Sequence, residues 1–383
     1  GGRKLNINFF GMLNQLYNNS GIKLLIDNPK NLIMICISLL FMYLAIFKKY
    51  EPYLLLPIAF GMFLVNFPFT NGEGLMDEGG LLYNLYQGVK LGIFPPLIFM
   101  AIGASIDFSP LIANPKTFLL GAAAQIGIFV AFIIAIALGF SATEASSIGI
   151  IGGADGPTAI HFTSKVAPHM LGSIAIAAYS YMALIPVIQP PIIKMLTTKK
   201  ERSIKMNQLR EVSRIEKIIF PIVVSAFTIL IVPSSAALIG MLMFGNLIKE
   251  SGVVPQLVEN VKNALLYIIT VFIGLTVGAT ANAENFLQIA TIKVIVLGLV
   301  AFIFGTAFGV LFGKLMCFLT KGKVNPMIGA AGVSAVPMAA RVVHKIGVEE
   351  DSSNFLFMHA MGPNVAGVIG SAVAAGILLS IFG

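Results

Sequence analysis

Charged residues and cysteines are scarce in this sequence. Asp, Glu, Lys and Arg make up only 11% of the 383 residues, whereas 57% are hydrophobic, and the mean hydropathy is +0.90. A chain of this length could not bury so much apolar surface inside a water-soluble core. The composition therefore excludes a soluble globular protein and predicts an all-α polytopic membrane protein.

The scarcity of cysteine excludes further classes. Only Cys36 and Cys317 are present, each in or beside an apolar run and without CxxC spacing, so we expect neither a disulfide framework nor a zinc site. Residues 1–30 contain no short apolar core followed by a small-residue cleavage site, so we predict no signal peptide. The net charge of +8 comes largely from loops that flank apolar runs, which argues against nucleic acid as a partner.

Apolar runs long enough to cross a bilayer recur along the chain, since a spanning helix needs about 20 residues. The 218–248 run is long enough for two short crossings broken at Pro233, and a further run, 91–106, is expected to bend at Pro95 and Pro96. The other candidate spans are 31–47, 52–69, 117–140, 170–196, 263–280, 288–313 and 353–382.

The longest polar stretch between spans, residues 197–217, holds seven Lys or Arg against three Glu. The positive-inside rule predicts that this basic loop is cytoplasmic. Counting spans from it puts other basic residues on the same side and acidic residues outside. These are Lys48, Lys49, Lys314, Lys321 and Lys323 for the cytoplasm, and Glu73, Asp77, Glu78 and Glu284 for the outside.

A segment broken by Gly and Pro occurs twice. IGIIGGADGP begins at Ile148, and IGAAGVSAVP begins 180 residues later at Ile328. Upstream of each copy, Ile102-Gly103-Ala104-Ser105 resembles Ile273-Gly274-Leu275-Thr276. An odd number of crossings separates the copies, so we predict inverted structural repeats with two broken or re-entrant segments that enter from opposite sides and meet near the midplane.

The expected organisation therefore has five parts. They are N-terminal scaffold spans at 1–90, repeat 1 at 91–196 with broken segment 145–165, the basic loop at 197–217, connecting spans at 218–262, and repeat 2 at 263–383 with broken segment 326–345.

Asp155 is the only acid in either broken segment. A carboxylate in an apolar surround costs about 2.5–3.5 kcal/mol on insertion scales and usually has a function, so we predict that it binds a coupling ion. The alternative is an interfacial turn, because Asp-Gly-Pro is also ordinary turn chemistry.

Neutral oxygens accompany this acid. Thr158 follows it, and the second copy offers Asn325, Ser334 and freed carbonyls near Gly329 and Gly332. One carboxylate among neutral oxygens suits a monovalent ion better than calcium, and it also suits a proton. Taken singly, Asn325 and Ser334 also fit ordinary helix starts and close packing.

Other residues could bind or protonate a substrate. Arg341, with Lys345 one turn later, could hold a carboxylate or simply flank the membrane. Tyr181 could donate a proton, although Tyr179 competes with it and membrane tyrosines are more often packing residues. Asn364 breaks the last span, and its amide could equally bond to backbone.

Four motifs together resemble one family. They are Gly152-Gly153-Ala154-Asp155-Gly156-Pro157-Thr158, Asn325-Pro326-Met327-Ile328-Gly329, Ser334-Ala335-Val336-Pro337 and Met361-Gly362-Pro363-Asn364. They are similar to the beta subunit of biotin-dependent, sodium-pumping decarboxylases, which act on oxaloacetate, methylmalonyl-CoA, glutaconyl-CoA or malonate. The similarity covers nearly the whole chain. The short length of the chain is more similar to the acyl-CoA branch of the family than to the oxaloacetate branch.

The resemblance implies that carboxybiotin is decarboxylated here while Na⁺ is exported across the bacterial cytoplasmic membrane. It implies a carboxyltransferase alpha subunit, a biotin carrier subunit, a small membrane-anchoring gamma or delta subunit, and a homo-oligomer. The implied site residues are Asp155, Tyr181, Asn325, Gly329, Ser334, Arg341 and Asn364. A secondary Na⁺- or H⁺-coupled carboxylate transporter would need the same repeats, acid and arginine but no biotin partner, and a membrane scaffold is a third class.

Overall fold

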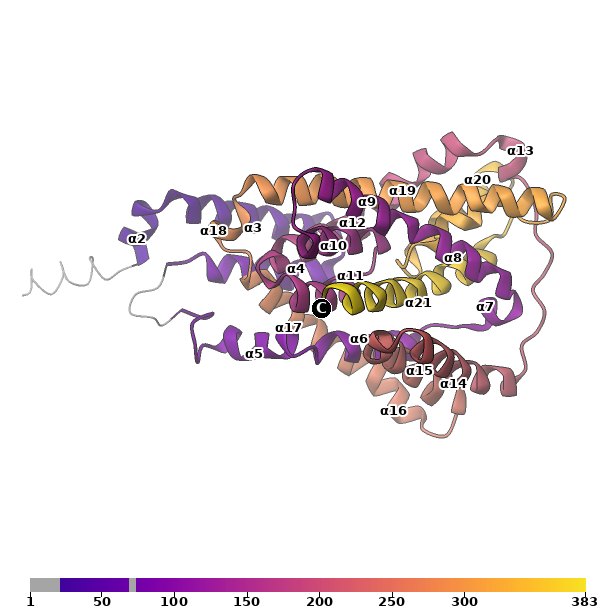
Figure 1. Cartoon of the computed structure of the whole chain (residues 1–383), viewed down its shortest axis with the longest axis horizontal. Helices are drawn as coiled ribbons and strands as arrows, with labels where there is room; N and C mark the ends of the chain where they lie inside the picture. The colour runs from indigo at the N-terminus through magenta and orange to yellow at the C-terminus, as the bar shows by residue number, and fades with distance from the viewer. Residues whose placement is uncertain (1–20, 69–73) are drawn as a thin grey trace, which may run out of the picture.

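A computed structural model describes residues 21–68 and 74–383, and every regular element in that part of the chain is helical (Figure 1). The expectations for residues 1–20, for residue 69 and for Glu73 lie outside the described residues. Within these described ranges, five helical runs are long and apolar enough to cross a membrane. They are α3 (Pro29–Phe47), Pro115–Ala137, Pro255–Ala279, α19 (Ile289–Leu319) and α21 (Phe357–Phe382). The protein is therefore an integral membrane protein, as composition predicted.

The first bent span differs in detail from the prediction. Helices α5 (Leu81–Lys90) and α6 (Phe94–Ser105) meet at 67°. The bend lies at Gly92, whose φ of +71° is easily reached only by glycine. Pro95 and Pro96 lie in the first turn of α6, where proline removes no intrahelical hydrogen bond, so they begin the helix and do not bend it.

A second bend divides α12 (Leu171–Leu196), whose two parts, Pro168–Met182 and Leu184–Leu196, meet at 63°. Pro186 explains it, because a proline lacks the N–H that would bond to the Met182 carbonyl and its ring clashes with that carbonyl.

The 218–248 run is two helices, as the sequence predicted. Helix α14 (Arg214–Ile231) ends before a 3₁₀ turn at Pro233–Ser235, and α15 (Ala236–Ser251) packs back against it. Helix α15 also packs on α6, and α4 (Pro52–Val65) packs on α17 (Leu266–Ala279). The remaining short helices are α2 (Gly21–Asp27), α7 (Ser109–Ala113), α13 (Lys199–Arg202), α16 (Pro255–Asn260) and α18 (Ala283–Phe286).

Each broken segment is a pair of short helices around an irregular tip. The first comprises α10 (Ala142–Ile150), η2 (Ile151–Gly153) and α11 (Gly156–Val166). The second comprises η6 (Pro326–Gly332) and α20 (Met338–Glu350). Helices α8 (Phe118–Ala124) and α9 (Ile126–Ala137), together with α19 and α21, surround both tips.

The molecule has two distinct ends. One carries the basic loop, α13 and the end of α20, and Figure 1 shows it on the right, with α5 and α18 on the left. Arg202 bonds to Glu350 at the basic-loop end. The first broken segment starts and ends at the opposite end of the molecule, where Glu144 near its start contacts His169 just after it. Lys314 contacts Glu201, which puts the last turns of α19 at the basic-loop end.

Candidate functional site

The two broken segments touch at their tips. The Ser334 amide donates a hydrogen bond to the Gly153 carbonyl at 3.0 Å, and the Ser334 hydroxyl donates to the Gly367 carbonyl of α21 at 2.8 Å. Ala154 adopts the left-handed conformation (φ +52°), which turns the chain between η2 and α11. A direct backbone bond therefore joins residues that lie 181 positions apart.

Asp155 lies beside this contact and caps α11. Its carboxylate accepts hydrogen bonds from the Thr158 hydroxyl (2.8 Å), the Thr158 amide (3.4 Å) and the Ser371 hydroxyl (2.8 Å). The side chain is 5% exposed, and no Lys, Arg or His among the described residues pairs with it. A buried carboxylate with only neutral donors is costly unless a cation or a proton neutralises it. The geometry therefore suits binding of a monovalent cation or a proton.

A central cavity of about 470 Å³ adjoins this carboxylate. Asp155 and Ser334 line it together with Ser105 and Asp107, which lie at the end of α6, and Asp107 also lies beside residues of the basic loop. Its remaining lining is mostly apolar and consists of Ile102, Ile106, Pro157, Met182, Leu266, Val336, Pro337, Phe357, Met361 and Val368. A ligand from the basic-loop end would reach Asp155 through this cavity.

The freed carbonyls of η6 do not lack partners. Three buried amides donate to them: Gln189 to Ala330 (2.9 Å), Gln125 to Gly332 (3.5 Å), and Asn364 to both Ala331 (3.0 Å) and Val333 (2.7 Å). These bonds replace the helical N–H groups that an irregular segment lacks. The oxygen of each of the three amides has no partner among the described residues, and the Gln125 oxygen faces Gly153.

Gly329 lies against α19 and not at Asp155. A methyl group on its Cα would lie 1.9 Å from the Gly309 carbonyl oxygen, so only glycine allows η6 and α19 to approach this closely. Packing alone is a sufficient reason for glycine at this position.

Asn325 is bound to the basic loop. Its amide donates to the carbonyls of Arg202 (3.0 Å) and Ile204 (2.8 Å), and its oxygen caps η6 by accepting from the Met327 amide (3.0 Å). Both polar atoms of the side chain are used in this way. The structure therefore groups Asn325 with Arg202 and not with Asp155 or Ser334.

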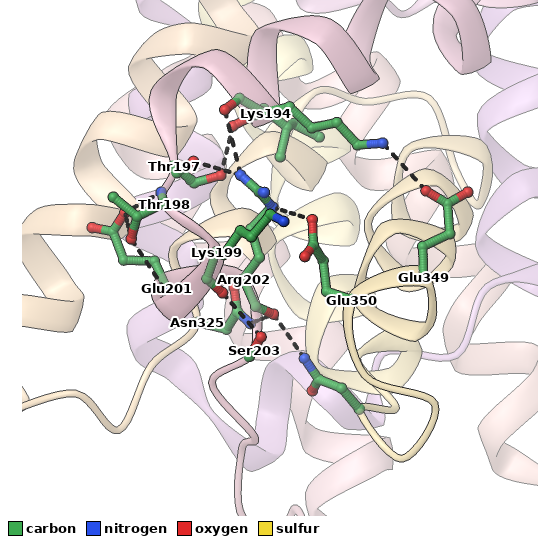
Figure 2. A network of polar contacts seen from close by, with 12 residues as sticks. Lys194, Thr197, Thr198, Lys199, Glu201, Arg202, Ser203, Asn325, Glu349 and Glu350 are labelled. Carbon is green, nitrogen blue, oxygen red and sulfur yellow. Dashed lines mark hydrogen bonds and ion pairs between the residues drawn. The ribbon is translucent and has the colours of Figure 1, made fainter.

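Arg202 is the centre of this polar network (Figure 2). Its side chain is 7% exposed, and it donates to Glu350 at 2.7 Å and to the Thr197 carbonyl at 2.5 Å. Its own carbonyl accepts from Asn325 and from Asn354 (2.8 Å). The network fixes both ends of the second broken segment to the end of α12, because Asn325 lies just before η6 and Glu350 is the last residue of α20.

Arg341 and Lys345 lie one turn apart on the same face of α20, and both are exposed. Neither side chain makes a hydrogen bond or ion pair with another described residue, and neither lines the central cavity. Glu349, one turn further, pairs with Lys194 at 3.3 Å. The structure thus leaves the Arg341 guanidinium available to a ligand but separate from the Asp155 site.

The two tyrosines of α12 face different neighbours. The Tyr181 hydroxyl donates to the Ile295 carbonyl of α19. The Tyr179 ring packs on Gly156, where a methyl group would lie 2.1 Å from ring atom Cε1 and 2.5 Å from Cζ. The Tyr179 hydroxyl is buried without a partner among the described residues. Tyr179, rather than Tyr181, is therefore the phenol at the tip that carries Asp155.

Sequence reasoning missed three side chains around the tips: Ser371, Gln125 and, as a wall of the cavity, Asp107. Ser371 lies in a small-residue stretch of α21 that suggests close helix packing, and Gln125 is the only amide in its apolar run. An isolated polar residue inside a span is a usable signal, because it must find a partner in the protein interior.

Comparison with known proteins reveals a close match over almost the whole chain. A family model described as Na⁺-transporting oxaloacetate decarboxylase beta subunit matches residues 30–382. Methylmalonyl-CoA decarboxylase subunit beta of Propionigenium modestum is 59% identical, covering 93% of this chain and 96% of the relative. Glutaconyl-CoA decarboxylase subunit beta of Acidaminococcus fermentans is 58% identical (92% and 93%), and the oxaloacetate decarboxylase beta chain of Klebsiella pneumoniae is 50% identical (91% and 94%).

Proposed function

The chain belongs to the family of Na⁺-transporting decarboxylase beta subunits, and from this premise we propose that it decarboxylates carboxybiotin and couples the reaction to Na⁺ export. The observation that carries the proposal is the buried Asp155 carboxylate, which has neutral hydrogen-bond donors, no cationic partner among the described residues and a cavity extending to the basic-loop end. Outward movement of one Na⁺ against 100 mV costs about 2.3 kcal/mol. An exergonic decarboxylation must therefore be tied to the ion.

Asp155 is the charged ligand of Na⁺ in this proposal, with Thr158 and Ser334 as nearby neutral oxygens. The Ser371 hydroxyl and the Gln125 oxygen join this set on the geometry described above. Asn325 and Gly329 act from further away, since Asn325 holds the start of η6 and Gly329 allows its packing on α19.

The substrate chemistry needs an anchor and a proton. Decarboxylation breaks the bond between the ureido nitrogen and the carboxyl carbon, leaves the electron pair on nitrogen, adds a proton there and releases CO₂. A dry site favours this step because the carboxylate loses its solvation. Arg341 is the proposed anchor with Lys345 beside it, and a buried α12 phenol is the proposed proton donor. Asn364 acts indirectly, because its amide holds the Ala331 and Val333 carbonyls of the second broken segment.

We infer that the chain is built from inverted repeats, 91–196 and 263–383, with the scaffold 1–90 before them and the connecting spans 218–262 between them. Two matching helix crossings support this inference, because in each one two glycines lie against carbonyl oxygens of the partner helix. A methyl group added to any of these glycines would lie 1.9 or 2.0 Å from that oxygen. The pairs are Gly61 with Leu275 and Gly278 with Ile58 on α4 and α17, and Gly245 with Met100 and Gly103 with Leu242 on α15 and α6.

The proposed partners are a carboxyltransferase alpha subunit, a biotin carrier subunit, a small gamma or delta membrane subunit, and further copies of this chain. The proposed location is the bacterial cytoplasmic membrane with loop 197–217 facing the cytoplasm. An acyl-CoA is the favoured parent substrate, because the acyl-CoA decarboxylase relatives are 57–59% identical and the oxaloacetate relatives 49–50%.

The test is reconstitution of the natively purified complex in proteoliposomes. We expect a streptavidin-reactive subunit to co-purify, and radioactive sodium to accumulate in the vesicles when the parent acyl-CoA is added. Avidin should block both decarboxylation and uptake. Sodium uptake driven by a carboxylate gradient without any biotinylated subunit would instead identify a secondary transporter.

A further inference from the structure

A second cavity, of about 760 Å³, opens at the basic-loop end and is called the basic-loop cavity below. Three segments form it: the α6–α7 turn, the basic loop with the start of α14, and the α20–α21 turn. Its residues with polar or charged side chains are Asp107, Ser109, Lys205, Gln208, Arg210, Glu211, Lys217, Ser353, Asn354 and His359. The family motifs that suggested site residues do not include any of these.

Two buried side chains in its wall lack partners for a polar atom. His359 is 8% exposed, and its Nδ1 has no hydrogen-bond partner among the described residues. Asn354 is 1% exposed; its amide donates to the Arg202 carbonyl, but no described group donates to its oxygen. A neutral imidazole nitrogen either donates or accepts, and an amide oxygen accepts. The His359 Nδ1 is itself closed off from solvent, so the position that a ligand could satisfy at this wall is the Asn354 oxygen, which accepts from an N–H group.

One lysine of the cavity has no ion pair. Lys205 pairs with Asp351 at 3.0 Å. Hydrogen bonds from Ser353, together with Lys205, lower the pKa of Asp351 to about 2, so this carboxylate is ionised at neutral pH and keeps Lys205 paired. Arg210 is held by Glu216 at 2.6 Å. Lys217 is partly buried and has no contact ion pair among the described residues; Asp107 of the same cavity attracts it electrostatically without touching it, so its ammonium group can still contact an anion.

The basic-loop cavity continues toward Asp155. Asp107 lines both this cavity and the central cavity, and Phe357 of the central cavity lies directly before Met358 of the basic-loop cavity. Phe355 and Met358 are exposed apolar side chains at this place. A ligand held here would have apolar contacts on one side and a path toward the Asp155 carboxylate on the other.

We propose that the basic-loop cavity is the binding site that receives the carboxylated ureido head of biotin before it reaches the Asp155 site. The proposal rests on the function proposed above. Lys217 binds the carboxylate, and Asn354 accepts from the ureido N–H. Phe355 and Met358 cover the sulfur-containing ring, since aromatic rings make favourable contacts with sulfur and methionine adapts its shape to an irregular apolar surface.

The first experiment measures single-turnover decarboxylation of the carboxylated carrier subunit by the purified complex. Lys217→Gln should raise the carrier concentration for half-maximal rate about tenfold, the usual effect of losing a charged contact, while the Na⁺ concentration for half-activation stays unchanged. Lys200→Gln is the matched control, because Lys200 is an exposed cation of the same loop outside the cavity. Equal effects of the two variants, or none, would overturn the assignment.

A second experiment blocks the cavity. In a background with Cys36 and Cys317 replaced by serine, Ser353→Cys is treated with a bulky thiol reagent, which should stop turnover unless carboxylated carrier is added first. Full turnover after modification would rule out the site. If the wild-type complex itself fails to decarboxylate the carrier in a Na⁺-dependent way, the proposed function fails. If the wild-type complex is active and the variants are equally active, only the cavity assignment fails.

Discussion

The Ser371 hydroxyl donates a hydrogen bond to Asp155 Oδ2 at 2.8 Å, joining the last helix of the chain to the first broken segment across 216 positions. The same hydroxyl lies 3.0 Å from the Val368 carbonyl of its own helix, which is the alternative acceptor for its single proton. The same carboxylate oxygen accepts from Thr158, so two hydroxyls fix its position. The carboxylate is therefore oriented by neutral groups before any ion arrives.

Asp155→Asn should abolish Na⁺ transport and the Na⁺ dependence of decarboxylation while the protein still assembles. The amide keeps the size and can still accept from Ser371 and Thr158, but it removes the charge that the proposed ion site depends on. Radioactive sodium uptake and the Na⁺ titration of turnover measure the effect. Normal Na⁺ activation in this variant would remove Asp155 from the ion site.

Ser371→Ala should weaken Na⁺ activation without abolishing it, with a half-activating concentration about tenfold higher, because a hydrogen bond to a charged group contributes about 1.5–3 kcal/mol. Ser380→Ala on the same helix is the control, since its hydroxyl bonds to the Ile377 carbonyl of its own helix and is exposed. If both variants titrate like the wild type, Ser371 has only a packing role.

Tyr179→Phe should reduce turnover more than Tyr181→Phe. The Tyr179 hydroxyl has no partner among the described residues and lies at the Asp155 tip, whereas the Tyr181 hydroxyl already donates to Ile295. Turnover and its pH profile distinguish the two, and each variant keeps its ring. A larger loss in Tyr181→Phe would support the family-implied donor and would require its hydroxyl to leave Ile295 during the cycle.

Arg341→Lys should lower carboxybiotin decarboxylation at least about tenfold, because lysine keeps the charge but not the planar fork that binds a carboxylate through two hydrogen bonds. Lys345→Arg, one turn away on the same exposed face, should have little effect. A normal single-turnover rate in Arg341→Lys would show that the guanidinium only flanks the membrane.

Gly329→Ala should sharply reduce the amount of folded protein, since its methyl group would collide with the Gly309 carbonyl. Gly240→Ala on α15 is the matched control, because nothing lies within 4 Å of the added methyl group. The control should be neutral or up to about 1 kcal/mol more stable. Melting of the detergent-solubilised protein measures both, and an unchanged transition in Gly329→Ala would contradict the packing explanation.

The sequence by itself determined the membrane class, most helix positions, the break at Pro233 and the position of Asp155 as an isolated acid in a broken segment. These features depend on local properties: apolar length, the backbone limits of Gly and Pro, and the cost of an acid among apolar residues. The family was also readable, because its motifs are contiguous in the chain.

The tertiary structure alone decided which side chains meet. Residues 179 and 181 differ by about 200° around a helix, so only packing shows that Tyr179 faces the tip that carries Asp155. Packing likewise brings Ser371 to that carboxylate and takes Asn325 to Arg202 instead. It also shifts the proposed match of the repeats by one turn, since Gly278 and not Gly274 lies against a backbone carbonyl oxygen as Gly103 does. Hydropathy fixes where a helix runs, but the rotation and depth of each helix follow from contacts between segments far apart in the chain.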